Sequence, residues 1–351
     1  MGLAAAVRGM TAEFRERACK RGHQSNLMSE PLDDTTPDPN GIYFPGTRYQ
    51  LYTVEPPCFS NDDQQCLHDN YSLERQRTEG VLALSLANRI RLPSTPSLSI
   101  TLSDRRCGGI REHITHVWAA HTSSPTLGDA STTVIAKFYD PLYFHDEYES
   151  VDPLRLSAQS VASEVKAYEM LQPLQGISVP RVIGLYATAI PQQNGRTVYV
   201  LLLELVAGKG LQYLCETGDE DGDVLGDYLC ENHREAIFAT MSRLALDLVS
   251  RGVFHADWAP RNVIIRPPAH PGPFCCDEHC PARFEIDADD VGATMIDFER
   301  VYLEDPPDLK NIHLVRRMFT NVVPSEYFFG WFRNLHTYPS LRLDALGQGS
   351  E

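Results

Sequence analysis

The stretch of the chain in which residue types and spacing could do chemistry is 252–265, which reads GVFHADWAPRNVII. Asp257 precedes Asn262 by five residues, and His255 stands two residues before the Asp. An Asp on such a loop can accept a proton from an attacking hydroxyl group, while the Asn can bind a metal ion that holds phosphate groups. The same pattern also occurs in surface loops, so the remaining chain must distinguish the two interpretations.

A second acidic residue, Asp297, ends the apolar run 293–297, ATMID. A similar run, 263–265, begins directly after Asn262. If the two runs are paired strands, they bring an amide oxygen and a carboxylate oxygen together, and oxygen ligands are those that Mg²⁺ prefers. The pattern therefore favours a magnesium site at Asn262 and Asp297.

A lysine within an apolar strand is the third feature. Lys137 lies in VIAKF, 134–138, where a charge needs a partner or solvent and where a strand-borne Lys can reach nucleotide phosphates. The helix predicted over 157–174 offers Glu164 as that partner, with Glu169 as the competitor. A lysine on the solvent-facing side of an edge strand is the alternative interpretation.

The elements that must position these residues are read from hydrophobic periodicity. Alternating apolar residues predict strands at 97–102, 115–121, 132–139, 179–186 and 197–206. Together these strands predict a five-stranded sheet with one inserted helix. A second predicted helix, 234–251, leads directly into the loop that carries Asp257.

Two glycine-bearing segments could contact a nucleotide. Gly108 and Gly109 connect the first two strands, where backbone amides could approach phosphate oxygens, although a plain hairpin bend explains them nearly as well. The last strand ends at Glu204-Leu205-Val206, shortly before Gly208. Such a link suits a hinge between two lobes, where we expect backbone groups of Glu204 and Val206 to hydrogen-bond an adenine edge.

Composition limits the classes of function. The chain has 351 residues, of which 42% are apolar, enough for a sizeable core. Lys and Arg number 31 against 47 Asp and Glu, and the net charge of −16 argues against binding to nucleic acid or to an anionic membrane surface. No run approaches the roughly 20 apolar residues of a membrane helix, and the N-terminus has no signal-peptide core. With an odd count of nine cysteines, these features predict an intracellular, cytoplasmic protein.

The segment that separates the two apolar runs contains CCDEHC at 275–280. Its three cysteines and one histidine are possible metal ligands, but they are too close in sequence for a usual tetrahedral site. A flexible loop is the favoured interpretation, and a metal-bound insert is the alternative.

These residues follow the order found in protein-kinase-like phosphotransferases. The chain resembles that superfamily over about residues 97–320, through Lys137, Glu164, the 204–206 link, His255-x-Asp257-x4-Asn262 and Asp297-Phe298-Glu299. The resemblance implies an α+β, two-lobed fold, with a five-stranded antiparallel N-lobe sheet that holds one helix and a reduced, mainly helical C-lobe. Lys137 would contact the α- and β-phosphates of ATP, and Glu164 would orient Lys137. Asp257 would be the catalytic base, and Asn262 and Asp297 would bind Mg²⁺.

Composition and strand pattern, together with the resemblance, give the expected organisation of the chain. The expected segments are a disordered extension at 1–45, an N-terminal extension of unknown role at 46–96, the N-lobe at 97–206, a truncated C-lobe at 207–340 and a flexible tail at 341–351.

Departures from the protein-kinase pattern bear on the substrate. Glu299 replaces the Gly of the Asp-Phe-Gly motif, Ala259 stands two residues after the expected base, and only 54 residues follow Asp297. In motif style the chain is similar to short kinase-like proteins and to choline and aminoglycoside kinases. The resemblance therefore implies Mg²⁺-dependent transfer of the γ-phosphate of ATP to a hydroxyl group of a small molecule or a protein. A pseudokinase that binds nucleotide or acts as a scaffold without turnover is the alternative. A kinase-shaped binding protein without nucleotide is a third hypothesis.

Overall fold

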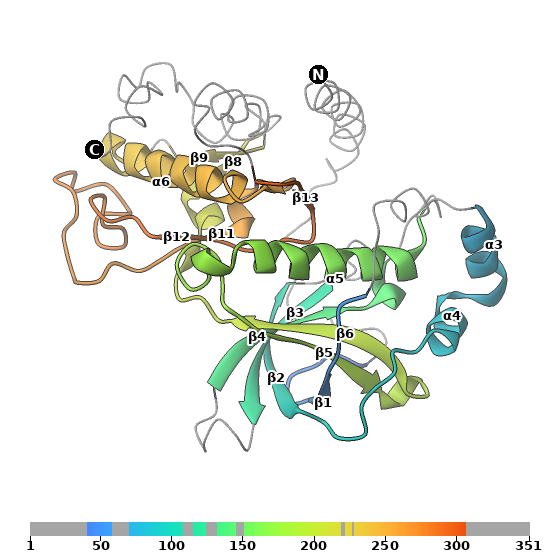
Figure 1. Cartoon of the computed structure of the whole chain (residues 1–351). Helices are drawn as coiled ribbons and strands as arrows, with labels where there is room; N and C mark the ends of the chain where they lie inside the picture. Colours follow the sequence, from blue (N-terminus) through green and yellow to red (C-terminus); the bar gives the residue numbers. More distant parts are fainter. Residues whose placement is uncertain are drawn as a thin grey trace, which may run out of the picture. The chain divides into compact units, whose positions relative to one another are not determined.

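The computed structural model describes residues 41–57, 70–107, 115–123, 132–144, 151–218, 222–226 and 228–306. From Ile42 onward these residues belong to one compact unit. Within it a β-barrel lies on one side and a smaller set of helical and short β elements on the other, with helix α5 (Pro153–Met170) running between them (Figure 1).

Six antiparallel strands close the barrel in the order β1-β2-β3-β4-β6-β5. Their bounds are β1 Arg48–Thr53, β2 Leu98–Cys107, β3 Thr115–Ser123, β4 Thr132–Tyr139, β5 Val182–Ile190 and β6 Arg196–Glu204. The prediction of a five-stranded sheet is therefore wrong. The sixth strand, β1, lies in the 46–96 segment expected to be an extension, and it pairs with β2 on one side and β5 on the other. Closure leaves these six strands without an open edge of unpaired backbone groups.

Side-chain alternation explains why so short a strand closes the barrel. In β1, Tyr49 and Leu51 are buried while Arg48 and Gln50 are exposed, because residues two apart on a strand point to the same face. Each large apolar side chain buried in this way contributes roughly 1.5–3 kcal/mol. The barrel core includes Ile42, Tyr43, Tyr49, Leu51, Ile100, Leu102, Trp118, Val134, Phe138, Ile190, Val198, Val200 and Leu202.

A buried ion pair lies beside this core. It joins Arg196, at the start of β6, to Asp140, directly after β4, and both side chains are completely buried. Arg196 Nη2 donates to Asp140 Oδ2 at 2.5 Å. Tyr43 Oη donates to the same carboxylate oxygen at 2.8 Å. Asp140 also accepts the backbone N–H of Leu142 through Oδ1 at 3.0 Å. The carboxylate thus joins the start of the described chain to strands β4 and β6.

Local capping explains the bounds of the helices. Asp152 is the N-cap of α5, where its side chain accepts the N–H groups of Leu154 and Arg155, and Pro153 occupies the first helical position. Two further helices, α3 (Asn70–Glu79) and α4 (Val81–Ala87), follow each other directly before β2. Gly80 separates them because its backbone adopts a φ of 83°, which is incompatible with a continuous helix.

The second part of the unit is built around helix α6 and four short strands. After α6 (Glu231–Val249) come β10 (Val253–His255), β11 (Val263–Ile265), β12 (Ala293–Met295) and β13 (Val301–Leu303). β10 pairs with β13, and β11 pairs with β12 and with β7 (Lys209–Gly210), all antiparallel. Strands β8 (Cys215–Gly218) and β9 (Gly222–Leu225) pair with each other, also antiparallel.

The expectation of a mainly helical second lobe is not met within the described residues from 207 to 306. There α6 is the one α-helix, and the remaining regular structure consists of short strands and single turns of 3₁₀-helix. The apolar runs that flank Asn262 and Asp297 form strands of only three residues each, and these strands join β7 in a three-stranded sheet in the order β12-β11-β7. α6 packs its buried Ile237, Met241 and Leu248 over this region, in a core separate from that of the barrel.

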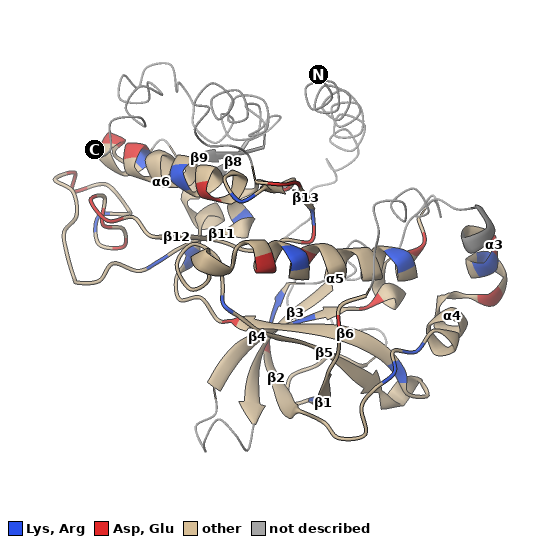
Figure 2. Cartoon of the chain, viewed as in Figure 1, with Lys and Arg blue, Asp and Glu red and all other residues tan. Residues whose placement is uncertain are grey.

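Charge is unevenly distributed over the elements. Figure 2 shows charged residues along α3, α5, α6 and the loop between β11 and β12, and few on the barrel strands. Strands β3, β4 and β5 together carry one charged residue, Lys137. Within the described part of the chain, no helix has the length and apolarity that crossing a membrane requires.

Candidate functional site

Lys137 is the centre of a buried cluster of charges. Its Nζ atom lies 2.7 Å from Glu164 Oε2, 2.7 Å from Asp297 Oδ1 and 2.8 Å from Glu299 Oε1, and only 5% of its side chain is exposed. Burial lowers the pKa of Lys137, but the three carboxylates more than reverse this and raise it well above its usual value. The lysine therefore carries its positive charge at neutral pH.

Glu164, on α5, is fully buried and accepts three hydrogen bonds. Its Oε2 accepts from Lys137 and from the Tyr139 hydroxyl, and its Oε1 accepts the backbone N–H of Phe298 at 3.3 Å. Burial raises the pKa of Glu164 to about 7, partly opposed by Lys137. The competing Glu169 is exposed and pairs with Lys166 on its own helix at 3.0 Å. Glu164 is thus the helix residue that holds the lysine.

Asp297 is the exposed member of the cluster, with 40% of its side chain accessible. Burial of its carboxylate raises its pKa, but the Lys137 ammonium outweighs that effect and holds the pKa of Asp297 at about 2. The residue has a φ of 66°, in the left-handed region that few residues other than Gly adopt. Such a backbone is costly, and in folded proteins it is concentrated at functional sites.

The loop after β10 holds Asp257 and Asn262 in fixed relation. The amide nitrogen of Asn262 donates to the Asp257 backbone carbonyl at 2.9 Å and to its Oδ2 at 3.2 Å. One guanidinium nitrogen of Arg261 donates to both carboxylate oxygens of Asp257, each at 2.7 Å. A single 3₁₀ turn, Pro260–Asn262, brings Arg261 and Asn262 back toward the Asp.

His255 ties this loop to the segment that carries Asp297. Its Nδ1 accepts the backbone N–H of Asp257 at 3.1 Å, so its Nε2 carries the proton and donates to the Ile296 carbonyl at 3.3 Å. Burial lowers the pKa of His255, which favours this neutral form. The imidazole is therefore a brace between the two loops.

The paired strands complete the frame. Asn262 immediately precedes β11, and Asp297 lies two residues after the end of β12. Between them, Val263 pairs with Met295, and the Ile296 N–H donates to the Asn262 carbonyl at 2.9 Å. On the other side, the Ala256 N–H donates to the Arg300 carbonyl at 2.8 Å. Two ladders thus hold the loops 256–262 and 296–300 against each other.

The predicted hinge residues lie at the end of the barrel. Glu204 accepts the Arg181 N–H through its side chain at 3.1 Å and donates its own N–H to the Arg181 carbonyl at 2.9 Å. The backbone N–H of Glu204 is therefore not available to an adenine edge. Val206 lies two residues after the end of β6. Gly208 has a φ of 142°, and a Cβ there would lie 2.2 Å from the Ile265 carbonyl oxygen. Only a glycine lets this link pass so close to β11.

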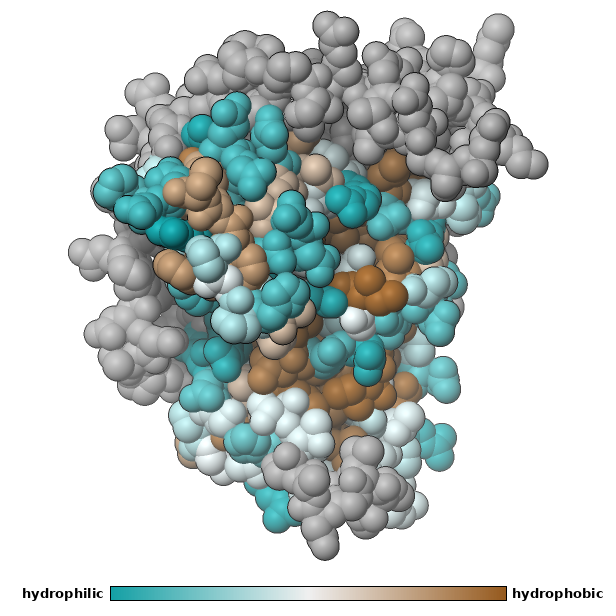
Figure 3. Space-filling view, turned by 90° about the vertical axis from the view of Figure 1, so that its left-hand side faces the viewer, coloured by the Kyte–Doolittle hydropathy of each residue, from teal (hydrophilic) through white to brown (hydrophobic). Residues whose placement is uncertain are grey.

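Figure 3 shows one face of the unit, on which a continuous apolar area is bordered by hydrophilic residues.

Gly108 and Gly109, the predicted phosphate-contacting glycines, lie outside the described residues, as do residues 307–351.

Three residues of the site were not identified from the sequence. Tyr139 lies two positions after Lys137 on β4, so strand periodicity could have placed it on the same face. In the sequence, Glu299 stands out only because it replaces the Gly of the Asp-Phe-Gly motif. Arg261 is a residue of the loop with no assigned role. Neither contact has a local sequence signal, because each depends on how a loop turns back.

No family model and no curated protein matches this chain. Among solved structures it is similar to one described as "WaaP in complex with acyl carrier protein". The two chains are 13% identical, the match covers 75% of this chain and 88% of that chain, and the TM-score is 0.32. Similarity at this level assigns neither a family nor an activity.

Proposed function

We propose that this protein is an ATP- and Mg²⁺-dependent phosphotransferase of protein-kinase-like fold that transfers the γ-phosphate to a hydroxyl group of a small molecule or a protein. The observation that carries the proposal is the Lys137 cluster with its three carboxylates. Removing such charges from water costs several kcal/mol for each ion, and apolar residues of similar size are often at least as stabilising. A function that needs a cation held in a fixed position accounts for the cluster better than stability does.

In this role Lys137 binds the α- and β-phosphates, and Glu164 fixes its position. The three hydrogen bonds to the Glu164 carboxylate leave it little freedom to move. A fixed cation lowers the entropy lost when the nucleotide binds and stabilises charge where it develops in the transition state.

The donor set fits Mg²⁺. The carboxylate oxygens of Glu164, Asp297 and Glu299 all lie within 4.8 Å of one another, and one ammonium cannot neutralise three carboxylates. Asp297 and Asn262 would hold the ion, with Glu299 as a further oxygen donor, because a hard cation prefers oxygen ligands. When bound, Mg²⁺ would neutralise charge on the nucleotide phosphates.

Asp257 is the proposed general base, which accepts the proton of the attacking hydroxyl group. Asn262 orients it through the hydrogen bond to its carboxylate, and His255 positions its backbone. A positioned base of this kind typically contributes a rate factor of about 10² to 10⁴.

One observation favours a second candidate function, a pseudokinase that binds nucleotide without turnover. Arg261 donates to both oxygens of the Asp257 carboxylate, so the carboxylate must leave this ion pair, or share it, before it accepts a proton. Arg261 is 57% exposed, so solvent screening weakens the pair and a substrate phosphate could draw the guanidinium away.

The test measures thermal stabilisation by MgATP and release of phosphate from [γ-³²P]ATP. The chains to compare are the native protein, Asp257→Asn, Asp297→Asn and the control Asp305→Asn, which alters an exposed acidic residue. We expect the native and control chains to be stabilised by MgATP and to consume it. Asp297→Asn should lose both responses, and Asp257→Asn should keep the stabilisation and lose the turnover. If MgATP neither stabilises the native chain nor is consumed, the proposal fails, and stabilisation without turnover would favour the pseudokinase.

A further inference from the structure

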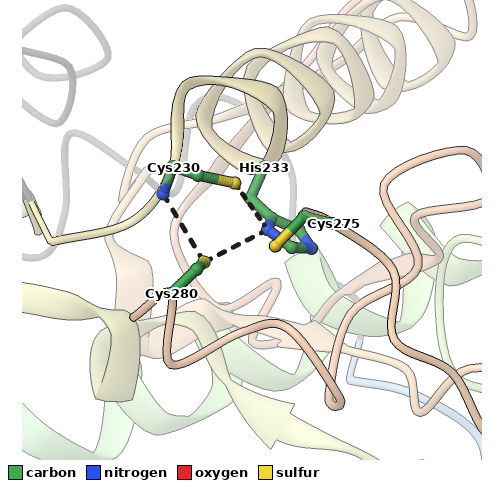
Figure 4. A group of neighbouring side chains, drawn as sticks. All are labelled: Cys230, His233, Cys275 and Cys280. Carbon is green, nitrogen blue, oxygen red and sulfur yellow. Dashed lines mark hydrogen bonds between the residues drawn. The ribbon is translucent and has the colours of Figure 1, made fainter. Parts of the chain in front are cut away.

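A second cluster of possible ligands lies away from the Lys137 site, where the long insert 266–292 meets the start of α6. It consists of Cys230 and His233 from the first turn of α6 and of Cys275 and Cys280 from the insert (Figure 4). The three sulfur atoms and one imidazole nitrogen all lie within 4.8 Å of one another. Only Cys275 and Cys280 belong to the 275–280 stretch, whose own four possible ligands are too close in sequence for a usual tetrahedral site.

The distances fit tetrahedral coordination. His233 Nδ1 lies 3.1 Å from Cys230 Sγ and 3.3 Å from Cys280 Sγ. In a tetrahedral zinc site, bonds of about 2.3 Å to sulfur and about 2.0 Å to nitrogen place the nitrogen and sulfur ligands about 3.5 Å apart. The observed separations therefore need only a small outward shift to accept the ion.

The histidine is oriented as a metal ligand. His233 is completely buried, and its Nε2 donates to the Ile286 carbonyl at 2.8 Å. Because a carbonyl can only accept, the proton lies on Nε2 and the lone pair on Nδ1, the atom that faces the sulfurs. A backbone carbonyl that fixes the tautomer in this way is the usual support of a zinc-bound histidine.

The sulfurs have matching support. The backbone N–H of Cys230 donates to Cys280 Sγ at 3.5 Å. Cys230 is also the N-cap of α6, where the helix dipole favours negative charge. A disulfide between any two of the three cysteines would leave the third cysteine and the histidine without a role, whereas one metal ion uses all four ligands.

The insert needs such an attachment. Its described residues form turns with no helix or strand of their own, yet Cys280, Ala282 and Ile286 are buried in the core under α6. A chain segment of this length without regular structure has few backbone hydrogen bonds to oppose its conformational entropy. Metal coordination supplies that free energy in many small irregular segments.

We propose that Cys230, His233, Cys275 and Cys280 bind one structural zinc ion, which fastens the 266–292 insert to the start of α6. The ligand pattern is Cys-x2-His followed by Cys-x4-Cys. The three thiols release their protons on binding, and the closed set of four protein ligands leaves no position for a substrate, as in structural rather than catalytic zinc sites.

The test measures metal content of the full chain, produced in zinc-supplemented medium and purified without chelators. Elemental analysis should find one zinc per chain, and a thiol-modifying reagent should release that zinc to a chromogenic indicator. Replacement by Co²⁺ should give sulfur-to-cobalt charge-transfer absorption and the intense d–d bands of tetrahedral coordination. None of these measurements depends on phosphotransfer, so the outcome for the zinc site and the outcome for the proposed activity are independent.

Matched variants locate the ligands. Cys275→Ser and Cys280→Ser should lose the zinc, whereas the controls Cys276→Ser and His279→Gln should keep it, because these exposed neighbours lie outside the cluster. Should a ligand variant fail to fold, the stoichiometry and the cobalt spectrum of the native chain still decide the matter. Absence of stoichiometric metal, a disulfide between two of the three cysteines, loss of zinc from a control, or one iron or copper in its place would each overturn the proposal.

Discussion

Replacing Glu164 by Gln should alter how the stability of the protein depends on pH. In the folded chain, burial raises the pKa of Glu164 from 4.5 to about 7. Folding therefore favours the protonated carboxyl group, so its stabilising contribution is complete below pH 4.5 and is lost as the pH rises through about 7. A Gln side chain has the same size and can still accept a hydrogen bond from Lys137, but it does not ionise.

The magnitude follows from the size of the pKa shift. At roughly 1.4 kcal/mol per pKa unit, a rise from 4.5 to about 7 corresponds to about 3 kcal/mol. The residue is completely buried, so solvent screening does not reduce this value. Between about pH 5 and pH 8, the native chain should lose up to about 3 kcal/mol of unfolding free energy relative to Glu164→Gln. Phosphotransfer by the variant should fall, because Lys137 loses the negative charge of its buried partner.

Urea unfolding at about pH 5 and about pH 8, with EDTA and without nucleotide, measures this loss of unfolding free energy. Glu169→Gln is the matched control, since this residue lies on the same helix but is exposed and pairs only with Lys166. The control should follow the native chain at both pH values. If the native chain and Glu164→Gln lose the same unfolding free energy between the two pH values, the reasoning is refuted. Glu164 would then ionise in the folded chain without an energetic cost.

Three further substitutions test the frame around the site by urea unfolding. Asp140→Ala leaves the buried charge of Arg196 unpaired and should cost roughly 3–5 kcal/mol; a loss below about 1 kcal/mol would show that the pair is dispensable. Tyr139→Phe removes one hydrogen bond to a buried carboxylate and should cost about 1.5–3 kcal/mol, which an unchanged midpoint would contradict. Gly252→Ala forces a left-handed residue, and its Cβ would also lie 2.0 Å from a backbone carbonyl oxygen. Gly46 is the control, because it has a φ of 86° but open space around it. Gly46→Ala should lower the unfolding free energy by only the roughly 1–2 kcal/mol that the left-handed backbone costs. Equal losses in the Gly46 and Gly252 variants would contradict the clash at Gly252.

The positions of the site residues were predictable where a local rule applied. Lys137 could be singled out because a single charge in an apolar strand needs a partner, and the following helix supplied Glu164. The loop around Asp257 and Asn262 was found from spacing alone, and the two apolar runs beside it indicated the strand pair that joins Asn262 to Asp297. Each inference used residues close in sequence or a strong penalty for burial, and the roles of these residues in catalysis stay predictions.

What the sequence could not indicate depends on contacts between distant segments. β1 looks like any short amphipathic strand, and its pairing with β5, Tyr52 opposite Ala187, joins residues more than a hundred positions apart. Nothing in the local pattern says that such a strand closes a barrel rather than lying in an extension. The same limit applies to Cys230 and His233, whose partners in the insert become neighbours only after α6 and the two ladders have formed.

The proposed zinc site and the Lys137 site are joined by the same short elements. β11 and β12 have Asn262 and Asp297 at one end and the 266–292 insert at the other, so the insert is the loop of a hairpin whose open end is the proposed magnesium site. The zinc ligands would fasten that loop to the first turn of α6, and the last turn of α6 leads through Gly252 into the loop of Asp257. The core under α6 includes Cys280 of the zinc cluster and Val263 and Met295 of the two strands, together with Tyr139 of β4. Loss of zinc should therefore loosen the β11–β12 hairpin and, with it, the residues proposed to bind Mg²⁺ and to accept the proton.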